Sequence, residues 1–183
     1  MVIMDDNRIS EKKLTDAFKG FLLKNEIIQE DASHFDGDDE TKSDVEISIS
    51  NNFISNKLEM KKIYIEVKTH HSTDSQNTIH KVFGQLLKET GKRTLKDQEC
   101  LAIMFPHEPA EWKAQGKTIK KTCGVGYYRQ GFKKIDKEKF IRFGELVSVK
   151  YIFSFSSKEQ KLEIYEWKDF LSTNVGPILI LPK

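Results

Sequence analysis

The sequence predicts one domain of the α/β (α+β) class, in which a central mixed β-sheet is flanked by helices. Two runs, 44–50 and 63–69, alternate apolar and polar residues with the period of a β-strand. Two longer segments, 10–28 and 76–90, place apolar residues at helical spacing. The 183 residues suffice for one hydrophobic core and are too few for two comfortable ones, so we expect residues 1–183 to fold as a unit.

The first expected helix spans residues 10–28, and Ser10 is a suitable N-cap. The residues that follow form an apolar stripe at helical spacing: Leu14, Ala17, Phe18, Phe21 and Leu22. The next segment, 30–43, is acidic and contains Gly37. It predicts a loop or a short strand with a turn.

The two alternating runs predict an antiparallel hairpin that is connected through a long polar segment. In each run the apolar residues face one side and the polar residues face the other. A pairing of residue 50 with residue 60 would place Asp44 opposite Glu66. Both would then share the polar face of the hairpin with Lys68.

The second expected helix, 76–90, follows this hairpin in the chain. Asp74 or Ser75 can cap its start, and Gly91 can end it. Its apolar face comprises Ile79, Val82, Phe83, Leu86 and Leu87.

The segments that follow continue the sheet and its helices. Residues 101–105 form a short apolar run that is typical of a buried strand. We expect residues 110–121 to be helical, residues 123–128 to form a strand, and residues 136–143 to form a short helix.

The C-terminal part of the chain predicts a second hairpin. Two further alternating runs, 147–155 and 161–167, flank a polar turn. The tail, 177–182, is apolar, and we expect it to pack on the core.

Composition excludes several classes of protein. No apolar run approaches the roughly 20 residues of a transmembrane helix. The start lacks the basic flank and the apolar stretch of a signal peptide. The two cysteines, Cys100 and Cys123, are too few for a disulfide framework or a four-thiolate zinc site. We therefore expect no membrane partner and a cytoplasmic location.

Charge is distributed unevenly along the chain. Residues 1–60 carry seven Lys or Arg against 14 Asp or Glu, whereas residues 61–183 carry 23 against 14. A basic cluster within 113–142 includes the candidate DNA-binding residues Lys117, Lys120, Lys121, Arg129, Lys133 and Lys134. This cluster is either a surface that faces phosphates or a solvated Lys-rich face. Aromatic residues interleave with it and could contact nucleic acid or belong to the core: Trp112, Tyr127, Tyr128 and Phe132.

The candidate catalytic residues include an acid and an amine that lie two residues apart on the second expected strand. Glu66 and Lys68 project from one face, which Asp44 can reach. Two carboxylates with the Val67 backbone carbonyl between them suit a hard divalent cation such as Mg²⁺. Lys68 beside the metal could hold or help deprotonate an attacking water. Gln85, on the following helix, could orient water or a phosphate oxygen.

These residues resemble the motif of the PD-(D/E)xK nuclease superfamily, whose members share a restriction-endonuclease-like fold. Asp44 and the triplet Glu66-Val67-Lys68 match the motif, although Ser43 stands where Pro often precedes the Asp. The segment 82–88, Val-Phe-Gly-Gln-Leu-Leu-Lys, resembles the Gly-Gln-Leu helix that many members carry after the Lys strand.

The resemblance covers residues 9–130 as a nuclease core. Its first strand would fall within residues 28–36. Residues 131–183 would then form a C-terminal extension that carries an extra β-hairpin.

The resemblance implies a role for each matching residue. Asp44 and Glu66 would ligate Mg²⁺ together with the Val67 carbonyl, Lys68 would activate water, and Gln85 would support them. Glu11 on the first helix could serve a second metal. The alternative for Asp44, Glu66 and Lys68 is the solvated face of a half-exposed sheet.

Two further alternatives concern single residues of the site. Gln85 could be an ordinary amide on the surface of its helix. Glu46 shares the face of Asp44 and could be a ligand in its place.

The expected function is that of a Mg²⁺-dependent endonuclease acting on double-stranded DNA, and most simply that of a type II restriction endonuclease. It would act as a homodimer, or as the small catalytic subunit of a heterodimeric type IIS enzyme with a larger recognition subunit. The modest net charge of +2 slightly favours the second form, because a chain that relies on a partner for DNA affinity needs fewer phosphate contacts of its own. A repair or recombination nuclease, such as a junction resolvase, is the alternative within this class. A non-catalytic DNA- or protein-binding module on the same fold is the alternative outside it.

Overall fold

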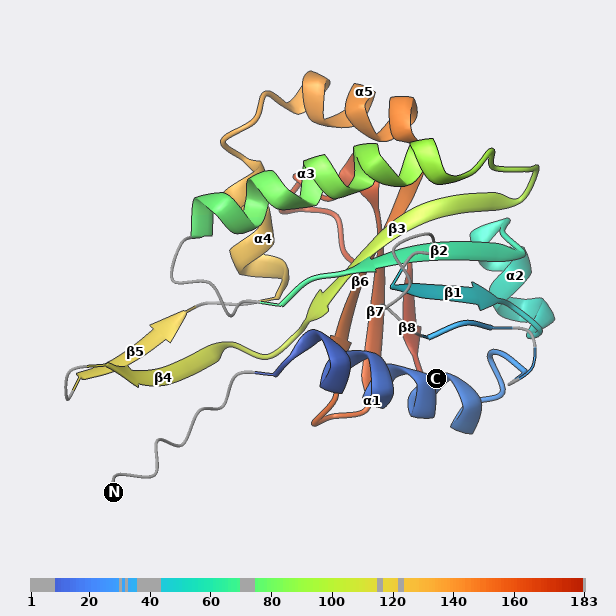
Figure 1. Ribbon diagram of the computed structural model, residues 1–183, viewed down its shortest axis with the longest axis horizontal. Helices are drawn as coiled ribbons and strands as arrows, with labels where there is room; N and C mark the ends of the chain where they lie inside the picture. The colour runs from blue at the N-terminus through green and yellow to red at the C-terminus, as the bar shows by residue number, and fades with distance from the viewer. Residues whose placement is uncertain are drawn as a thin grey trace.

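A six-stranded mixed sheet with helices on both faces forms the body of the molecule in a computed structural model (Figure 1). The structure describes residues 9–29, 31, 33–35, 44–69, 75–114, 117–121 and 124–182. The strands of the sheet lie in the order β1-β2-β3-β6-β7-β8. Their bounds are Val45–Ser48 (β1), Lys62–Val67 (β2), Glu99–Pro106 (β3), Val149–Ser156 (β6), Lys161–Glu166 (β7) and Leu179–Leu181 (β8). This confirms the α+β class and the mixed sheet.

Parallel pairing is confined to the centre of the sheet. β2, β3 and β6 run parallel to one another, while β1 pairs with β2, β7 with β6 and β8 with β7 in antiparallel fashion. The carboxyl ends of β2, β3 and β6 therefore meet at one edge of the sheet, where open α/β sheets commonly bind ligands.

One face of the sheet is covered by α1, which spans Glu11–Lys24 (Figure 1). Ser10 caps this helix as predicted, because its hydroxyl oxygen accepts a hydrogen bond of 3.2 Å from Lys13 N–H. Phe18 and Phe21 pack edge-on or tilted against Phe155 of β6, with ring centroids 5.3 Å apart in both pairs. The inward residues of β1 and β2 join the same core.

The opposite face carries three helices: α3 (Ser75–Lys92), α4 (Val125–Phe132) and α5 (Lys137–Val147). Aromatic rings join these helices to the sheet. The ring of Phe140 is stacked on Trp167, with centroids 4.2 Å apart, and Trp167 Nε1–H donates to the Phe140 carbonyl at 2.9 Å. Phe132 packs against both rings.

The predicted register of the first hairpin is confirmed. Val45 pairs with Ile65 and Ile47 with Ile63, which is the alignment that sets residue 44 opposite residue 66. The connection between the strands contains a helix that the sequence analysis did not predict, α2 (Asn52–Leu58). Asn51 caps it by accepting a hydrogen bond from Ile54 N–H.

Two predictions for residues 110–128 are wrong. The expected helix 110–121 is instead a separate antiparallel hairpin, β4 (Ala110–Ala114) and β5 (Lys117–Lys121), which projects from the body (Figure 1). Trp112 lies opposite Ile119 in this hairpin, so its apolar residues follow the strand period.

Within the expected strand 123–128, the residues from Val125 onward are instead the start of α4, and Cys123 lies outside the described residues. Gly124 precedes α4 with a φ of 67°, a conformation that ends an extended segment and favours glycine. Tyr128 and Phe132 are both buried in the core and lie four residues apart, which is helical spacing.

Smaller corrections concern helix 76–90 and the sheet edges. α3 continues through Gly91 to Lys92, and Leu87 is exposed rather than part of its apolar face. The expected first strand lies within residues 28–36. Its described residues form two isolated antiparallel bridges, Ile28 with Ile49 and His34 with Glu46.

The C-terminal segment completes the sheet. The predicted hairpin of β6 and β7 is confirmed, and it belongs to the central sheet rather than lying outside it, because β6 pairs with β3. The apolar tail adds β8 and buries Leu179 and Leu181, as expected. The predicted helix at 136–143 is confirmed as α5. Among the described helices, none is long and apolar enough to cross a membrane.

Gly20 and Gly144 offer a matched test of this packing, because both lie inside helices. A Cβ at Gly20 meets nothing within 4 Å, whereas one at Gly144 meets the Trp167 indole. We expect Gly20→Ala to raise the free energy of unfolding by about 0.5–1 kcal/mol through helix propensity. We expect Gly144→Ala to lower it by about 1–3 kcal/mol through overpacking. Urea denaturation measures both, and an equal gain in the two variants would contradict the described packing of α5.

Candidate active site

The antiparallel pairing of β1 and β2 brings Asp44 beside the end of β2. Asp44 lies one step beyond the Val45–Ile65 pair and directly precedes β1. Its Oδ2 accepts a hydrogen bond of 2.8 Å from the Val67 backbone N–H. The predicted convergence of Asp44 on this strand end is therefore present.

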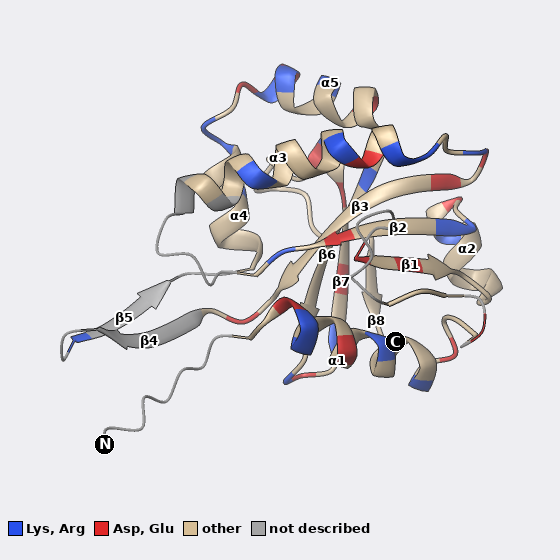
Figure 2. Cartoon of the chain, in the orientation of Figure 1, with Lys and Arg blue, Asp and Glu red and all other residues tan. Residues whose placement is uncertain are grey.

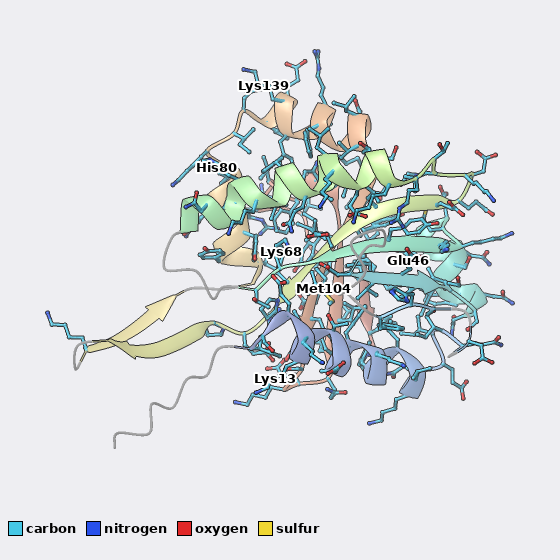
Figure 3. The ribbon with its side chains drawn as sticks, viewed as in Figure 1. Lys13, Glu46, Lys68, His80, Met104 and Lys139 are labelled. Atoms are coloured by element: carbon cyan, nitrogen blue, oxygen red, sulfur yellow. The ribbon has the colours of Figure 1, made fainter. Side chains whose placement is uncertain are left out.

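Glu66 and Lys68 form a buried ion pair at the carboxyl end of β2. Only 5% of Glu66 and 6% of Lys68 is exposed. Lys68 Nζ lies 2.7 Å from Glu66 Oε1 and donates a second hydrogen bond, of 2.8 Å, to the Val67 carbonyl. Figure 3 shows Lys68 at the centre of the molecule, between α3 and α1. The solvated-face alternative does not describe these two side chains, because helices cover both faces of the sheet.

Burial changes the acidity of both carboxyl groups. Desolvation raises the pKa of Glu66 to about 7, an effect that Lys68 opposes and the charge of Asp44 reinforces. Desolvation also raises the pKa of Asp44, against the lowering effects of the Val67 N–H and the Lys68 charge. A cation that approached these carboxylates would stabilise their charged forms.

A third buried carboxylate, Glu89 of α3, was missed by the sequence analysis. It is 3% exposed, and its charge raises the pKa of both Asp44 and Glu66. Glu89 follows Leu86 by three residues and Val82 by seven, so it occupies a core position of the helix. A charged residue in that apolar stripe was the signal that could have identified it.

Basic side chains from the end of α3 hold Glu89. Lys92 Nζ lies 2.5 Å from its Oε1, and the Arg93 guanidinium lies 3.3 Å from its Oε2. Arg93 also binds Glu46 Oε1 at 2.9 Å. Glu46 is therefore engaged in a structural ion pair, which supports Asp44 rather than Glu46 as the ligand.

Gln85 lies on α3 and Glu11 on α1, in the helical layers on the two faces of the sheet. Gln85 Oε1, on α3, is buried and has no hydrogen-bond partner among the described residues. This distinguishes Gln85 from a surface amide, because a buried unsatisfied oxygen is costly. Glu11, on α1, is half exposed, and its Oε1 lies 3.8 Å from Lys68 Nζ.

The candidate DNA-binding residues are placed differently from one another. Lys117 on β5 is exposed, as are Lys133 and Lys134 after α4. Arg129 is half-buried, and its Nε–H donates to the Phe170 carbonyl at 2.6 Å. The side chains of Lys120 and Lys121 lie outside the described part of the structure, as does that of Trp112. Tyr128 and Phe132 are core residues.

Among the described residues, no group of three or more His, Cys, Asp or Glu side chains is arranged to hold a metal ion. The oxygen atoms at the strand end come from Asp44, Glu66 and the Val67 carbonyl. Such a set lacks soft donors and suits a hard cation rather than zinc.

Comparison with protein-family models, with curated proteins and with solved structures gave no match to this chain. Function has to be argued from the site itself.

The raised pKa of Glu66 gives a stability prediction. In the folded state Glu66 keeps its proton up to a pH of about 7, whereas its ordinary pKa is 4.5. The stabilising effect of proton uptake is complete below about pH 4.5 and is lost as the pH rises through 7. We expect the stability of the wild type relative to Glu66→Gln to fall over this window, by up to about 3 kcal/mol.

Urea denaturation in EDTA at pH 4.5–8 measures this difference. Glu145→Gln, at an exposed position of α5, is the matched control for the loss of one carboxylate. A constant difference between the wild type and Glu66→Gln across this range would contradict the buried state of Glu66.

Proposed function

We propose that this chain is a metal-dependent endonuclease that hydrolyses phosphodiester bonds of double-stranded DNA. The observation that carries the proposal is the meeting of Asp44, Glu66 and Lys68 around the Val67 carbonyl at the carboxyl end of a parallel strand. Buried groups with perturbed pKa values cluster at functional sites, which supports a chemical role for this strand end. The likeness to the PD-(D/E)xK motif supports the same activity.

The donor set at this strand end fits a hard divalent cation. Glu66 Oε1 and the Val67 carbonyl oxygen already converge on a single positive charge, that of Lys68 Nζ. Asp44 lies beside them, so these three residues would hold Mg²⁺, with Glu11 placed to reach a second ion. Bound Mg²⁺ supplies neutralisation of phosphate charge and a more acidic water.

Lys68 has the central role in the proposed reaction. Its ammonium group is held by Glu66 and the Val67 carbonyl, so its remaining N–H can orient the attacking water or bind a phosphate oxygen. Gln85 Oε1 can accept a hydrogen bond from that water. Attack by the water oxygen forms the new P–O bond, the P–O bond to the leaving sugar oxygen breaks, and that oxygen receives a proton.

Exposed lysines provide contacts to the DNA backbone in this proposal. Lys117 lies on β5 of the projecting hairpin, and Lys133 and Lys134 directly follow α4. Figure 2 shows α4 on the side of the body from which this hairpin projects. The described basic residues of this region are few, which favours added DNA contacts from a second copy or from a larger recognition subunit. Type II restriction is the biological role that we propose for this activity.

Plasmid cleavage tests the proposed activity. We expect the wild type with Mg²⁺ to convert supercoiled DNA into discrete nicked or linear products. Asp44→Asn and Lys68→Met keep the volume of each side chain, and we expect each to reduce the rate at least about 100-fold, because each removes a group that acts on the attacking water or on the phosphate.

The matched control is Lys158→Met, an exposed lysine of the β6–β7 turn, which should cleave like the wild type. If the chain alone is silent, the assay is repeated with candidate partner subunits from the same locus. Cleavage that survives in both Asp44→Asn and Lys68→Met would refute the assigned site, and silence under every condition would favour a binding module.

We expect replacement of Gln85 to raise stability and to lower activity. Replacement by Met removes the buried oxygen that lacks a partner, and we expect the free energy of unfolding to rise by about 1 kcal/mol. We expect the cleavage rate to fall about tenfold, as for one lost hydrogen bond in the transition state. Gln29→Met, at an exposed position, should change neither quantity. A variant of Gln85 that is both less stable and fully active would show that this amide is structural.

A further inference from the structure

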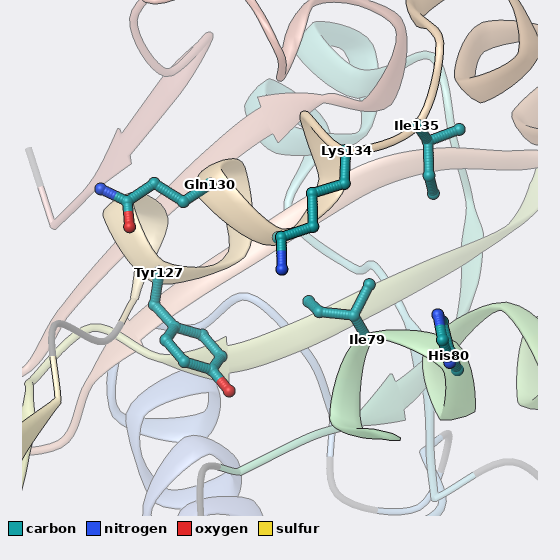
Figure 4. A pocket seen from close by; sticks show the side chains of 7 residues that line it. Ile79, His80, Tyr127, Gln130, Lys134 and Ile135 are labelled. Carbon is teal, nitrogen blue, oxygen red and sulfur yellow. The ribbon is translucent and has the colours of Figure 1, made fainter. Parts of the chain in front are cut away.

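A cavity of about 340 Å³ lies between α3 and α4, outside the site described above (Figure 4). Its lining comes from the first turns of α3, from α4 and from the turn that follows α4. The residues used below are Ile79, His80, Tyr127, Gly131, Lys134 and Ile135.

The cavity has a rigid apolar floor and one aromatic wall. Tyr127 is fixed by an edge-on contact with Tyr128, with ring centroids 5.1 Å apart, and Tyr128 is in turn stacked on Phe105. Ile79 is almost fully buried beneath the opening. Gly131 allows α4 to pack closely on Ile79, because a Cβ at this position would lie only 2.5 Å from Ile79 Cδ1. Such a pocket is preorganised for a flat apolar group.

The rim of the cavity is basic. Figure 4 shows the Lys134 side chain reaching across the opening toward Tyr127, with His80 on the α3 side. Lys133 and Lys81 are exposed on the adjoining turns. The described lining residues include no Asp or Glu. This charge favours a ligand that carries an anionic group beside its flat part.

We propose that this cavity binds one nucleotide of the substrate strand, with its base against Tyr127 and Ile79 and its phosphate at Lys134. The identity of the strand rests on the proposed nuclease function. Figure 3 shows Lys68 beneath α3 and His80, at the rim of the cavity, on the same helix. A strand that follows α3 would place one nucleotide in the cavity and a phosphate a few nucleotides away at Lys68. The cavity would help to select where the strand is cut.

Fluorescence anisotropy in EDTA tests this inference without cleavage. The probe is a labelled single-stranded oligonucleotide of 12 thymidines, and the competitors are thymidine monophosphate and inorganic phosphate. We expect Lys134→Gln and Tyr127→Leu each to weaken oligonucleotide binding at least about fivefold, which is the scale of one lost base stack or one lost phosphate contact. We expect thymidine monophosphate to compete better than inorganic phosphate.

Lys158→Gln is the matched control for charge, and thermal unfolding verifies that Tyr127→Leu is folded. Lys134 is exposed, so its variant tests the inference even if the Tyr127 variant is unstable. Wild-type affinity in Lys134→Gln, or equal competition by phosphate and nucleotide, would overturn the inference. Unchanged oligonucleotide binding in both variants, together with competition by the free nucleotide, would place nucleotide binding outside the cavity and would also overturn the inference.

The outcome is separable from that of the proposed function. Asp44→Asn should bind the oligonucleotide like the wild type and fail only in cleavage. Loss of cleavage activity with an intact cavity therefore tests the strand-end site, whereas loss of oligonucleotide affinity in the cavity variants tests the nucleotide site.

Discussion

The buried ion pair between Glu66 and Lys68 is the interaction on which this end of the molecule depends. Both charges lie on a strand that helices cover from two sides, and either charge alone would destabilise the fold by several kcal/mol. The mutual attraction, together with the Val67 carbonyl, offsets much of that desolvation. Well-packed apolar residues commonly serve stability as well or better. Stability therefore gives no reason for this pair, whereas the proposed chemical role would.

The surroundings of the pair are arranged so that its charges can coexist. Asp44 and Glu89 add two more carboxylates nearby, each of which raises the pKa of Glu66. Lys92 and Arg93 neutralise Glu89 from the end of α3, and Arg93 connects this group to Glu46 of β1. Gln85 contributes a buried oxygen without a partner among the described residues. Several unfavourable terms thus gather at one strand end, as happens where function rather than stability has shaped a site.

Local patterns in the sequence were sufficient to predict the first hairpin and the register of its two strands. Alternation with a period of two leaves few alignments of β1 on β2, and the pairing of Val45 with Ile65 is one of them. That alignment alone carries Asp44 to Glu66 and Lys68. The burial of Glu66 could not be predicted in the same way, because it depends on α3 packing across a face that looked polar. Glu89 was missed for the related reason that its partners, Lys92 and Arg93, come from the end of a helix that was expected to stop at Gly91.

Residues 110–132 show where local reasoning fails. The glycine-containing segment before Tyr128 resembled a strand, but the positive φ of Gly124 turns the chain so that Tyr128 stacks on Phe105. This contact joins residues that are distant in the sequence, and it is made by α4. The cavity beside Tyr127 depends on the same helix. The β6–β7 hairpin belongs to the central sheet because β6 pairs with β3. No short window of sequence specifies that pairing.

Binding of Mn²⁺ to the metal-free protein, followed by electron paramagnetic resonance, tests the central claim most directly. A catalytic strand end should bind Mn²⁺ in the wild type, and this binding should be lost or weakened at least about tenfold in both Asp44→Asn and Glu66→Gln. Each of these variants removes one anionic oxygen ligand. Equal binding in the wild type and both variants, or no binding in the wild type, would show that Glu66 and Lys68 form a structural ion pair and would contradict the proposed catalytic site.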